Sequence, residues 1–516
     1  MSIAEPPLPP QRPAPLDRWR ERLTLDPRRG RLYAWLVPTV ITFVAGLLRF
    51  WNLGHPRAIV FDETYYVKDS WSQWMLGYPA KWPYDGDALF LGGDTNAFET
   101  AGSFVVHPPL GRFFIGAGIA LFGPDSSVGW RFAVAVFGTA TVLLVYLVAR
   151  TLTGSIVFAG VASGLIAIDG LSIVLSRIAL LDGILTFFVL LGFWFLLLDR
   201  RRHLHRLAAF AATHPERRAW GPVFWNRPWL LAAGAAIGAA SAVKWSGLSV
   251  LATFGIWVVA TDALARRRAG IGIWPADAAL RQGPVAFVLF VPVAALVYLA
   301  SWTGWLVTYG SYDRPTVDAA PAEGLWSWVP LALQNLWKYH TDIYGFHVGL
   351  VTPHSYESPA WQWPLLLRPT SMYWNQSDAG VEAVSSIPNP LIWWAGVAAV
   401  IFLLVRFAMT FEWRYATVLT GVAALYVPWL LYPDRTIFQF YTVALVPFVA
   451  LALTFALREA VGGADAVPTR RASGQYAVIA FLVAVALVSA FWYPVWTGIT
   501  VPYDFWRLHN WLPTWI

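Results

Sequence analysis

The chain has 516 residues, of which 57% are hydrophobic and only 13% are charged, and it carries a net charge of +7. Soluble proteins contain about 25% charged residues, so this composition argues against a soluble enzyme, a secreted domain or a disordered scaffold. It predicts a polytopic membrane protein. The absence of cysteine excludes disulfides, thiolate metal sites and a cysteine nucleophile.

The first segment, residues 1–32, is predicted to be a flexible basic cytoplasmic tail, because it contains seven prolines and seven arginines. A membrane-spanning helix needs about 20 mostly apolar residues. Residues 33–497 are therefore predicted to form one transmembrane domain with eleven spans. The predicted spans are 33–53, 129–150, 153–170, 179–199, 228–246, 247–264, 285–308, 391–408, 415–432, 436–457 and 476–497.

The connecting loops differ in charge, and this difference predicts their side of the membrane. Cytoplasmic loops collect Lys and Arg, and three loops are rich in arginine: 200–227, 265–284 and 458–475. The acidic loop 54–128 and the Trp-rich loop 309–390 are predicted to face outward, together with the tail 498–516. Orientation thus explains the positive charge without a nucleic-acid partner.

Two short amphipathic stretches lie in the first outer loop, at residues 62–78 and 110–122. Such stretches are typical of helices that lie along the membrane surface. The second stretch follows His107-Pro108-Pro109, a rigid extended turn, because a proline disfavours helical conformation in the residue before it.

Adjacent carboxylates at Asp62 and Glu63 follow the first predicted span. Neighbouring residues do not share a helix face, so the two are expected to have different roles. One interpretation makes Asp62 a general base, whose pKa is raised in a partly desolvated cleft. The alternative makes Asp62 the cap of the next helix, with Glu63 in its first turn.

Several cations lie in or beside apolar spans, where charges are costly and mark candidate functional sites. Arg177 is predicted to pair with Asp182, five residues further along. Arg131, Lys244 and Arg435 lie at the same predicted outer level, where they suit a lipid phosphate. Snorkelling toward the membrane surface is the alternative for each of these cations.

Three histidines in the second outer loop, His340, His347 and His354, are spaced by seven residues. This spacing suggests zinc, but Pro353 interrupts the helix that would align them, and no further ligand pattern completes a site. No metal site is therefore predicted. The surrounding aromatic residues, Trp361 and Trp363 among them, are more typical of a surface that binds sugar or peptide.

Taken together, these landmarks resemble the protein O-mannosyltransferase family, whose members have the all-α GT-C membrane fold. The matching motifs are Arg49, Phe61-Asp62-Glu63, His107-Pro108-Pro109-Leu110-Gly111, Trp130-Arg131, Ser176-Arg177-Ile178-Ala179-Leu180-Leu181-Asp182, Val243-Lys244-Trp245-Ser246-Gly247, Tyr339-His340, Phe346-His347, His354-Ser355-Tyr356, Trp361-Gln362-Trp363-Pro364-Leu365 and Arg435-Thr436-Ile437-Phe438. The sequence is similar to the actinomycete-type branch, because loop 309–390 holds no β-trefoil (MIR) insertion.

The resemblance implies inverting transfer of mannose from polyprenyl-phosphate-mannose to Ser or Thr hydroxyls of exported proteins, at the outer face of the plasma membrane. It implies that Asp62 is the catalytic base and that Glu63 holds the acceptor, and we expect Trp361 and Trp363 to contact the acceptor too. The residues expected to bind the donor phosphate or sugar are Arg49, Arg131, Lys244, Arg435, His107, His347 and His354.

Polyprenyl phosphate is a good leaving group, so neither a nucleotide nor an obligatory metal cofactor is expected. The protein export machinery is a candidate partner, beside membrane lipids. Two other functions compete with this interpretation: a related GT-C transferase that moves aminoarabinose or arabinose to lipid or glycan, and a lipid-linked sugar transporter or flippase. Transporters often show inverted repeats, and no repeat is evident here.

Overall fold

The computed structural model describes residues 26–214, 216, 218–463 and 466–515, and it is a predominantly helical, multi-span membrane protein. Seven helical segments in these residues are long and apolar enough to cross a membrane: Arg28–Phe50, Ser127–Thr153, Asp182–Thr213, Ser246–Arg268, Trp274–Ser301, Pro390–Thr410 and Pro468–Thr497. Each of the eleven predicted spans contains a helix, but the other four helices fall outside this set.

The bundle is built from eleven helices: α2 (Pro27–Phe50), α6 (Ser127–Thr153), α7 (Ile156–Ile168), α9 (Asp182–Thr213), α10 (Pro228–Val243), α11 (Ser246–Arg268), α13 (Gly283–Ser301), α16 (Pro390–Thr410), α17 (Trp413–Leu430), α18 (Val446–Val461) and α19 (Pro468–Thr497). The short elements between them are α8 (Gly170–Val174), α12 (Trp274–Ala276), a π-helical turn η1 (Asp277–Gln282) and a 3₁₀ turn η4 (Gln439–Ala444).

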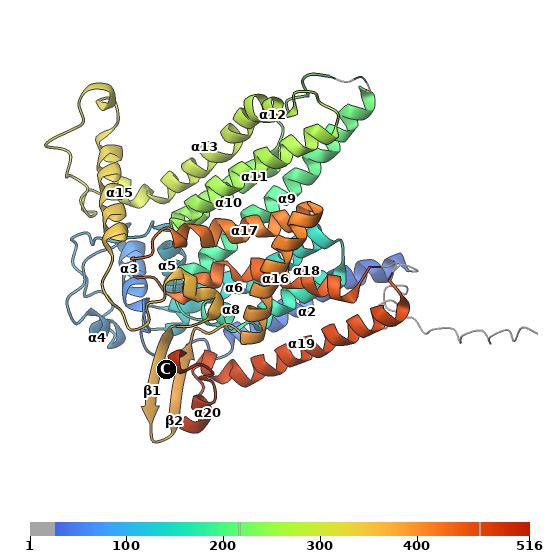
Figure 1. Ribbon diagram of the computed structural model, residues 1–516. Coiled ribbons are helices and arrows are strands. Elements are labelled where there is room, and N and C mark those ends of the chain that lie inside the picture. The colour runs from blue at the N-terminus through green and yellow to red at the C-terminus, as the bar shows by residue number, and fades with distance from the viewer. Residues whose placement is uncertain (1–25, 215, 217, 464–465, 516) are drawn as a thin grey trace, which may run out of the picture.

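Further short elements gather at the end of the bundle that holds the C-terminus (Figure 1). They are α3 (Glu63–Leu76), α4 (Gly86–Leu91), α5 (Leu110–Phe122), α14 (Thr303–Val307), η2 (Gly324–Trp326), α15 (Leu331–Gly349), η3 (Ala360–Leu365), the strands β1 (Ser371–Ser377) and β2 (Gly380–Ser385), α20 (Tyr503–Arg507) and η5 (Pro513–Trp515). The two strands pair antiparallel as a hairpin. The predicted site residues lie at this end, with Arg49 in the last turn of α2 and Arg131 one turn inside α6.

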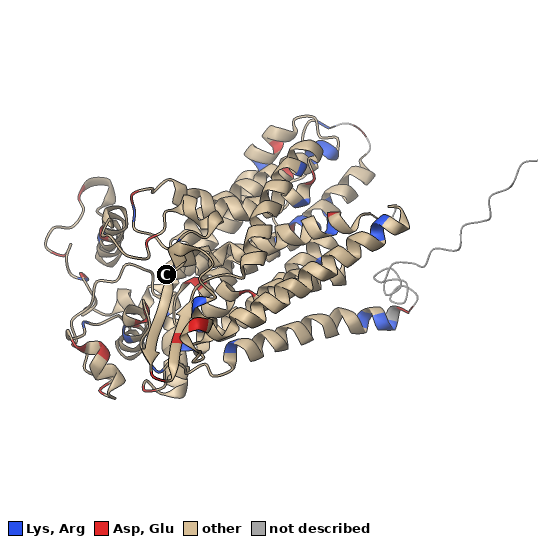
Figure 2. Cartoon of the chain, turned by 60° about the horizontal axis from the view of Figure 1, so that its bottom comes forward, with Lys and Arg blue, Asp and Glu red and all other residues tan. Residues whose placement is uncertain are grey.

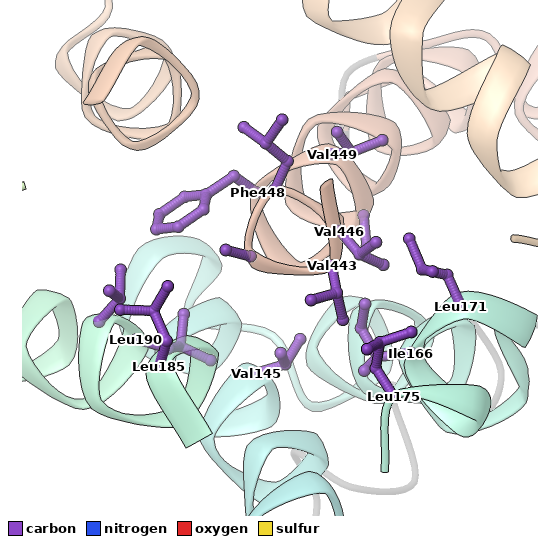
Figure 3. Close-up of a cluster of buried hydrophobic side chains, with 14 of the residues drawn as sticks. Val145, Ile166, Leu171, Leu175, Leu185, Leu190, Val443, Val446, Phe448 and Val449 are labelled. Atoms are coloured by element: carbon purple, nitrogen blue, oxygen red, sulfur yellow. The ribbon is translucent and has the colours of Figure 1, made fainter. Parts of the chain in front are cut away.

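Apolar side chains from distant parts of the chain form the core. Figure 3 shows Val145 of α6, Leu185 and Leu190 of α9, and Val446 and Phe448 of α18 directed toward one another, and all five are buried. In the same core α6 packs against α2, α7 and α9, while α10 lies between α9 and α13. The core thus holds α9 and α10 in place, and Asp182 at the start of α9 and Lys244 directly after α10 lie at the end that carries the short elements.

Several predicted boundaries are wrong. Residues 27–32 belong to α2 and not to a flexible tail, because Asp26 caps this helix by accepting from the Arg28 and Arg29 backbone amides. The predicted 436–457 span begins as the 3₁₀ turn η4 and becomes α-helical only at Val446. Residues 1–25 of the predicted tail lie outside the described residues.

Two predicted loop segments are also more ordered than expected. Helix α9 continues to Thr213, well into the predicted loop 200–227. The predicted tail 498–516 packs on the bundle, because Trp515 is 5% exposed and its ring lies 5.7 Å from that of Trp492. The predicted amphipathic stretches correspond to α3 and α5, and α5 begins at Leu110 directly after the His-Pro-Pro turn.

The two ends of the bundle differ in charge. Figure 2 shows Lys and Arg gathered at the helix ends that are remote from the C-terminus. This basic end is formed by the first turns of α2 and α19, by the last turn of α11 and by the arginines at positions 200–206 of α9. At the opposite end lie the first turns of α3 and α9, with Asp62 and Asp182. The site residues are therefore remote from the basic end.

Candidate active site

The carboxylate of Asp62 does not cap the helix that it precedes. Asp62 occupies the N-cap position of α3, but its side chain makes no capping hydrogen bond. The helix-cap interpretation is thus not supported. Burial raises the pKa of Asp62 to about 6; the nearby ammonium of Lys244 lowers it, and the nearby Asp182 carboxylate raises it. At pH 7 such a carboxylate is about 90% ionised, so it can accept a proton.

Two tyrosines that sequence reasoning missed lie near this carboxylate. Tyr66, one turn further along α3, and Tyr441, in η4, each interact electrostatically with Asp62 and Asp182. Burial raises the pKa of both phenols well above the ordinary value, so both keep their protons. Each hydroxyl can donate a hydrogen bond to a sugar or a phosphate oxygen. The only signal for Tyr66 was its place four residues after Asp62.

The backbone just before Asp62 adopts an unusual conformation. Phe61 has a φ of 48°, in the left-handed region that costs about 1–2 kcal/mol for a residue with a side chain. Its ring packs edge-on against Phe438 and Phe440, with both centroids 5.6 Å away. Strained backbone that persists because packing holds it is common at functional sites. Here the packing of Phe61 sets the direction of Asp62.

Glu63 occupies a different environment from its neighbour. It is fully buried, and its carboxylate accepts hydrogen bonds from Arg131 at 2.8 and 2.9 Å. The backbone amides of Val60 and Ala179 donate to the same carboxylate at 3.0 and 2.8 Å. Four donors thus surround a carboxylate with no exposed surface. The geometry favours a structural role for Glu63 over the predicted contact with the acceptor.

Two arginines hold the backbone between α2 and α3. Arg131 is 1% exposed, and beyond Glu63 it donates to the carbonyls of Leu53, Pro56 and Ala58. Arg177 donates to the carbonyls of Arg49, Trp51 and Asn52, at 2.7 to 3.1 Å. Arg131 is thus engaged inside the protein, and the geometry does not favour it as a phosphate ligand.

Arg49 is likewise enclosed. It has no exposed surface, and its guanidinium donates to the hydroxyls of Ser172 and Ser176 and to the carbonyls of Ala45, Ile166 and Ala167. These bonds connect α2 to α7 and α8. The predicted donor contact of Arg49 does not fit this geometry.

The predicted pairing of Arg177 with Asp182 is wrong. Asp182 instead pairs with Lys244, whose ammonium donates to both carboxylate oxygens at 2.9 and 3.0 Å. Both side chains are less than 10% exposed, and the Lys244 ammonium lies 4.2 Å from the centre of the Tyr441 ring. Lys244 therefore reaches the neighbourhood of Asp62 with its charge already compensated.

Arg435 combines with two histidines into a second group of site residues. Its guanidinium lies 3.0 Å from Nδ1 of His347 and stacks 5.3 Å from the ring centre of Trp429. Nε2 of His347 lies 2.9 Å from the carbonyl oxygen of Val106. Burial and the charge of Arg435 lower the pKa of His347 to about 4. A neutral ring can donate from Nε2 and accept at Nδ1, so His347 orients Arg435.

His107 stacks on His347 with ring centroids 5.3 Å apart, and on the other side it faces Tyr66 at 6.2 Å. Burial lowers the pKa of His107 well below 6.5, with smaller effects from Lys244 and His347. Its buried Nδ1 has no hydrogen-bond partner among the described residues. The structure thus brings His107, His347 and Arg435 together, with Lys244 close by.

The remaining predicted residues divide by exposure. His354 lies outside α15, beyond Pro353, and its ring packs 6.0 Å from Phe61. Trp361 is 59% exposed, whereas Trp363 is 1% exposed and donates its indole N–H to the carbonyl of Ser358. Trp363 is thus part of the core, and only Trp361 presents a free aromatic surface. No group of three metal-binding side chains occurs within the described ranges.

Comparison with solved structures defines the class of protein. The chain resembles the S. cerevisiae protein O-mannosyltransferase Pmt1-Pmt2 complex bound to the sugar donor, with a TM-score of 0.70 at 16% identity, over 94% of this chain and 92% of that one. The fold is therefore that of the GT-C membrane glycosyltransferases.

Sequence comparison then identifies the family. Residues 98–266 match the family described as dolichyl-phosphate-mannose-protein mannosyltransferase, and residues 332–515 match its C-terminal four-transmembrane region. A Mycobacterium tuberculosis relative named polyprenol-phosphate-mannose–protein mannosyltransferase is 32% identical over 99% of this chain and 97% of its own length. A Mycolicibacterium smegmatis relative of the same name is 33% identical over 94% and 93%. The chain belongs to the protein mannosyltransferase family.

Proposed function

We propose that this chain transfers mannose from polyprenyl-phosphate-mannose to Ser or Thr hydroxyls of exported polypeptides. Relatives with this named activity match almost the full length of the chain, which favours mannose transfer over the aminoarabinose and flippase alternatives. The observation that carries the proposal is Asp62: an ionisable carboxylate that makes no capping bond, lies among Lys244, Tyr66 and Tyr441, and has a pKa near 6.

Transfer requires a base for the acceptor hydroxyl and stabilisation of the leaving phosphate. Asp62 takes the hydroxyl proton as the oxygen attacks the anomeric carbon, from the face opposite the phosphate, so the configuration inverts. Arg435 is the cation best placed for the phosphate, because it lies beside the neutral His347 and its buried Nε has no partner among the described residues. Lys244 contributes less, since Asp182 already neutralises it.

Further side chains can contact the sugar or the acceptor peptide. The protonated hydroxyls of Tyr66 and Tyr441 can hold the sugar, and His107 can offer its unpartnered ring nitrogen. Trp361 is exposed enough to stack against an acceptor peptide, and His354 packs against Phe61, the residue before Asp62. Aromatic rings of this kind bind both sugar faces and peptide side chains.

The proposed orientation places this site outside the plasma membrane. The basic end of the bundle, remote from Asp62, is assigned to the cytoplasm, because cytoplasmic ends collect Lys and Arg. Figure 2 shows this separation of charge along the helices. The N-terminus is then cytoplasmic and the C-terminus extracytoplasmic, on the side where exported chains emerge.

The test measures transfer of labelled mannose from polyprenyl-phosphate-mannose to a Ser/Thr-rich peptide by the purified protein. We expect Asp62→Asn to reduce turnover at least ~100-fold, the usual scale for a general base. Asp69→Asn, on the same helix seven residues further along, is the matched control and should keep most activity. Near-normal turnover by Asp62→Asn would contradict the proposal, as would transfer of arabinose or aminoarabinose in place of mannose.

A further inference from the structure

A groove between α11 and α17 opens on the outside of the bundle, at the basic end. Its volume is about 940 Å³. The lining residues of α11 recur every three or four positions and thus form one face of that helix, and α17 contributes a face that includes small side chains. Its lining includes Thr253, Arg267 and Arg268 of α11 and Trp413 and Ala423 of α17.

The length of this groove matches one leaflet of a bilayer. From Thr253 to Arg268 the lining face of α11 extends over 15 residues, which at 1.5 Å per residue is about 22 Å. Half of a bilayer is about 15 Å of hydrocarbon, or about 20–22 Å with its head-group region. An acyl chain can therefore lie along the apolar part of the groove while its head group reaches the arginines.

One end of the groove is strongly basic. Arg200 of α9 and Arg267 and Arg268 of α11 line it, and Arg200 lies close enough to Arg268 for mutual repulsion. Arg200 stacks on the Trp413 ring at 3.8 Å, and its buried Nε has no hydrogen-bond partner among the described residues. The guanidinium is thus held in place with a donor unused.

The acids around this end are engaged elsewhere. Glu412 acts electrostatically on Arg200, but it accepts its hydrogen bond from Arg414 at 2.8 Å, and Asp199 is held by Arg227. Asp262 is bound by Arg266 and His203. Neither Arg200 nor Arg268 forms an ion pair with a carboxylate among the described residues. Arginines that repel one another at the end of an apolar groove favour a ligand that has both a negative charge and a hydrocarbon chain.

We propose that this groove binds an anionic diacyl phospholipid, with its phosphate on Arg200 and Arg268 and one acyl chain along α11 and α17. Guanidinium groups bind phosphate through charge-assisted hydrogen bonds, and basic pockets between transmembrane helices select anionic lipids. The site lies at the opposite end of the bundle from Asp62, so it is separate from the proposed transfer site and does not depend on the proposed activity.

The test is native mass spectrometry of the purified, delipidated full-length protein, titrated with dioleoyl phosphatidylglycerol or dioleoyl phosphatidylcholine. We expect the first phosphatidylglycerol to bind about tenfold more tightly than phosphatidylcholine. The double variant Arg200→Gln/Arg268→Gln should lose this preference. The matched control Arg28→Gln/Arg31→Gln removes two exposed charges from α2 at the same end of the bundle and should keep it.

A second variant tests whether the apolar part of the groove holds an acyl chain. Ala423 is exposed and lines the groove, so Ala423→Phe fills the groove without entering the core. We expect it to weaken phosphatidylglycerol binding about fivefold or more while thermal stability in detergent is unchanged. Equal binding of the two lipids, equal losses in the Arg200/Arg268 and Arg28/Arg31 variants, or tight binding by Ala423→Phe would each overturn the proposal. Displacement of phosphatidylglycerol by a stoichiometric polyprenyl phosphate would overturn it too.

Discussion

Replacing Glu63 by Gln removes one of two adjacent carboxylates, and the structure predicts a consequence opposite to that of replacing Asp62. The Gln side chain has the same shape but only one oxygen. If that oxygen accepts from Arg131 Nε and the Ala179 amide, the new NH₂ group faces the other Arg131 nitrogen and the Val60 amide, which are both donors. The variant therefore loses the ion pair with Arg131 and places the amide NH₂ of Gln against two other hydrogen-bond donors.

The expected magnitude follows from burial. Glu63 is 0% and Arg131 1% exposed, so water cannot compensate the charge that remains on Arg131. Removing one partner of a buried ion pair costs about 3–5 kcal/mol. We expect the Tm of the detergent-solubilised protein to fall by at least about 5 °C, with a matching loss of folded protein in the membrane.

The assay compares Glu63→Gln with Asp62→Asn in thermal unfolding and in mannose transfer. The Asp62 pKa is raised in the folded state, from 3.8 to about 6, so its ionised form costs stability as the pH rises through that window. At pH 7 a neutral Asn removes this cost. Asp62→Asn should therefore keep or raise the Tm while it abolishes transfer, whereas the folded fraction of Glu63→Gln should retain measurable turnover.

An unchanged Tm for Glu63→Gln, together with a raised KM for the acceptor peptide, would refute this reasoning. That result would restore the role in acceptor binding expected from the family resemblance. Glu63→Ala does not discriminate as well, because it adds a cavity to the loss of charge.

Further outcomes concern the rest of the site. Transfer measured as kcat/KM should fall tenfold per pH unit below about pH 6, because the protonated Asp62 cannot act as a base. Arg435→Lys keeps the charge but loses the geometry set by His347, so the donor KM should rise about tenfold while the acceptor KM is unchanged. Lys244→Met should lower stability by about 3–5 kcal/mol, and adding Asp182→Leu should restore most of it in thermal unfolding. Chelating agents should leave transfer intact.

Much of the bundle could be predicted from hydropathy, because a span must be long and apolar wherever it occurs. Each of the eleven predicted stretches contains a helix. The predicted boundaries are wrong where polar residues continue a helix. Helix α9 extends past its apolar part, because Asp199 is paired with Arg227 and His203 with Asp262. The β hairpin was missed, because its strands are short and lie in a loop judged by its charge and aromatic content.

The candidate site was predicted in part. Asp62 was found from its position after the first span and from the family resemblance, and the structure removes the cap alternative. Pairing failed because sequence distance is a poor guide inside a bundle. Arg177 and Asp182 are five residues apart yet do not pair, whereas Lys244 reaches Asp182 across 62 residues. Trp361 is exposed and Trp363 is buried, although both belong to the same motif. The sequence does not show which of two tryptophans so close together is buried.

The six carbonyls held by Arg131 and Arg177 have a mechanical consequence. One of them is the Arg49 carbonyl in the last turn of α2, and the other five belong to the non-helical connection from Trp51 to Ala58, whose backbone would otherwise need water as a hydrogen-bond partner. The guanidinium groups of Arg131 and Arg177 supply those hydrogen bonds instead and restrict the motion of the connection. The segment that leads to Asp62 is therefore preorganised in the absence of substrate, and no energy from substrate binding is needed to shape it.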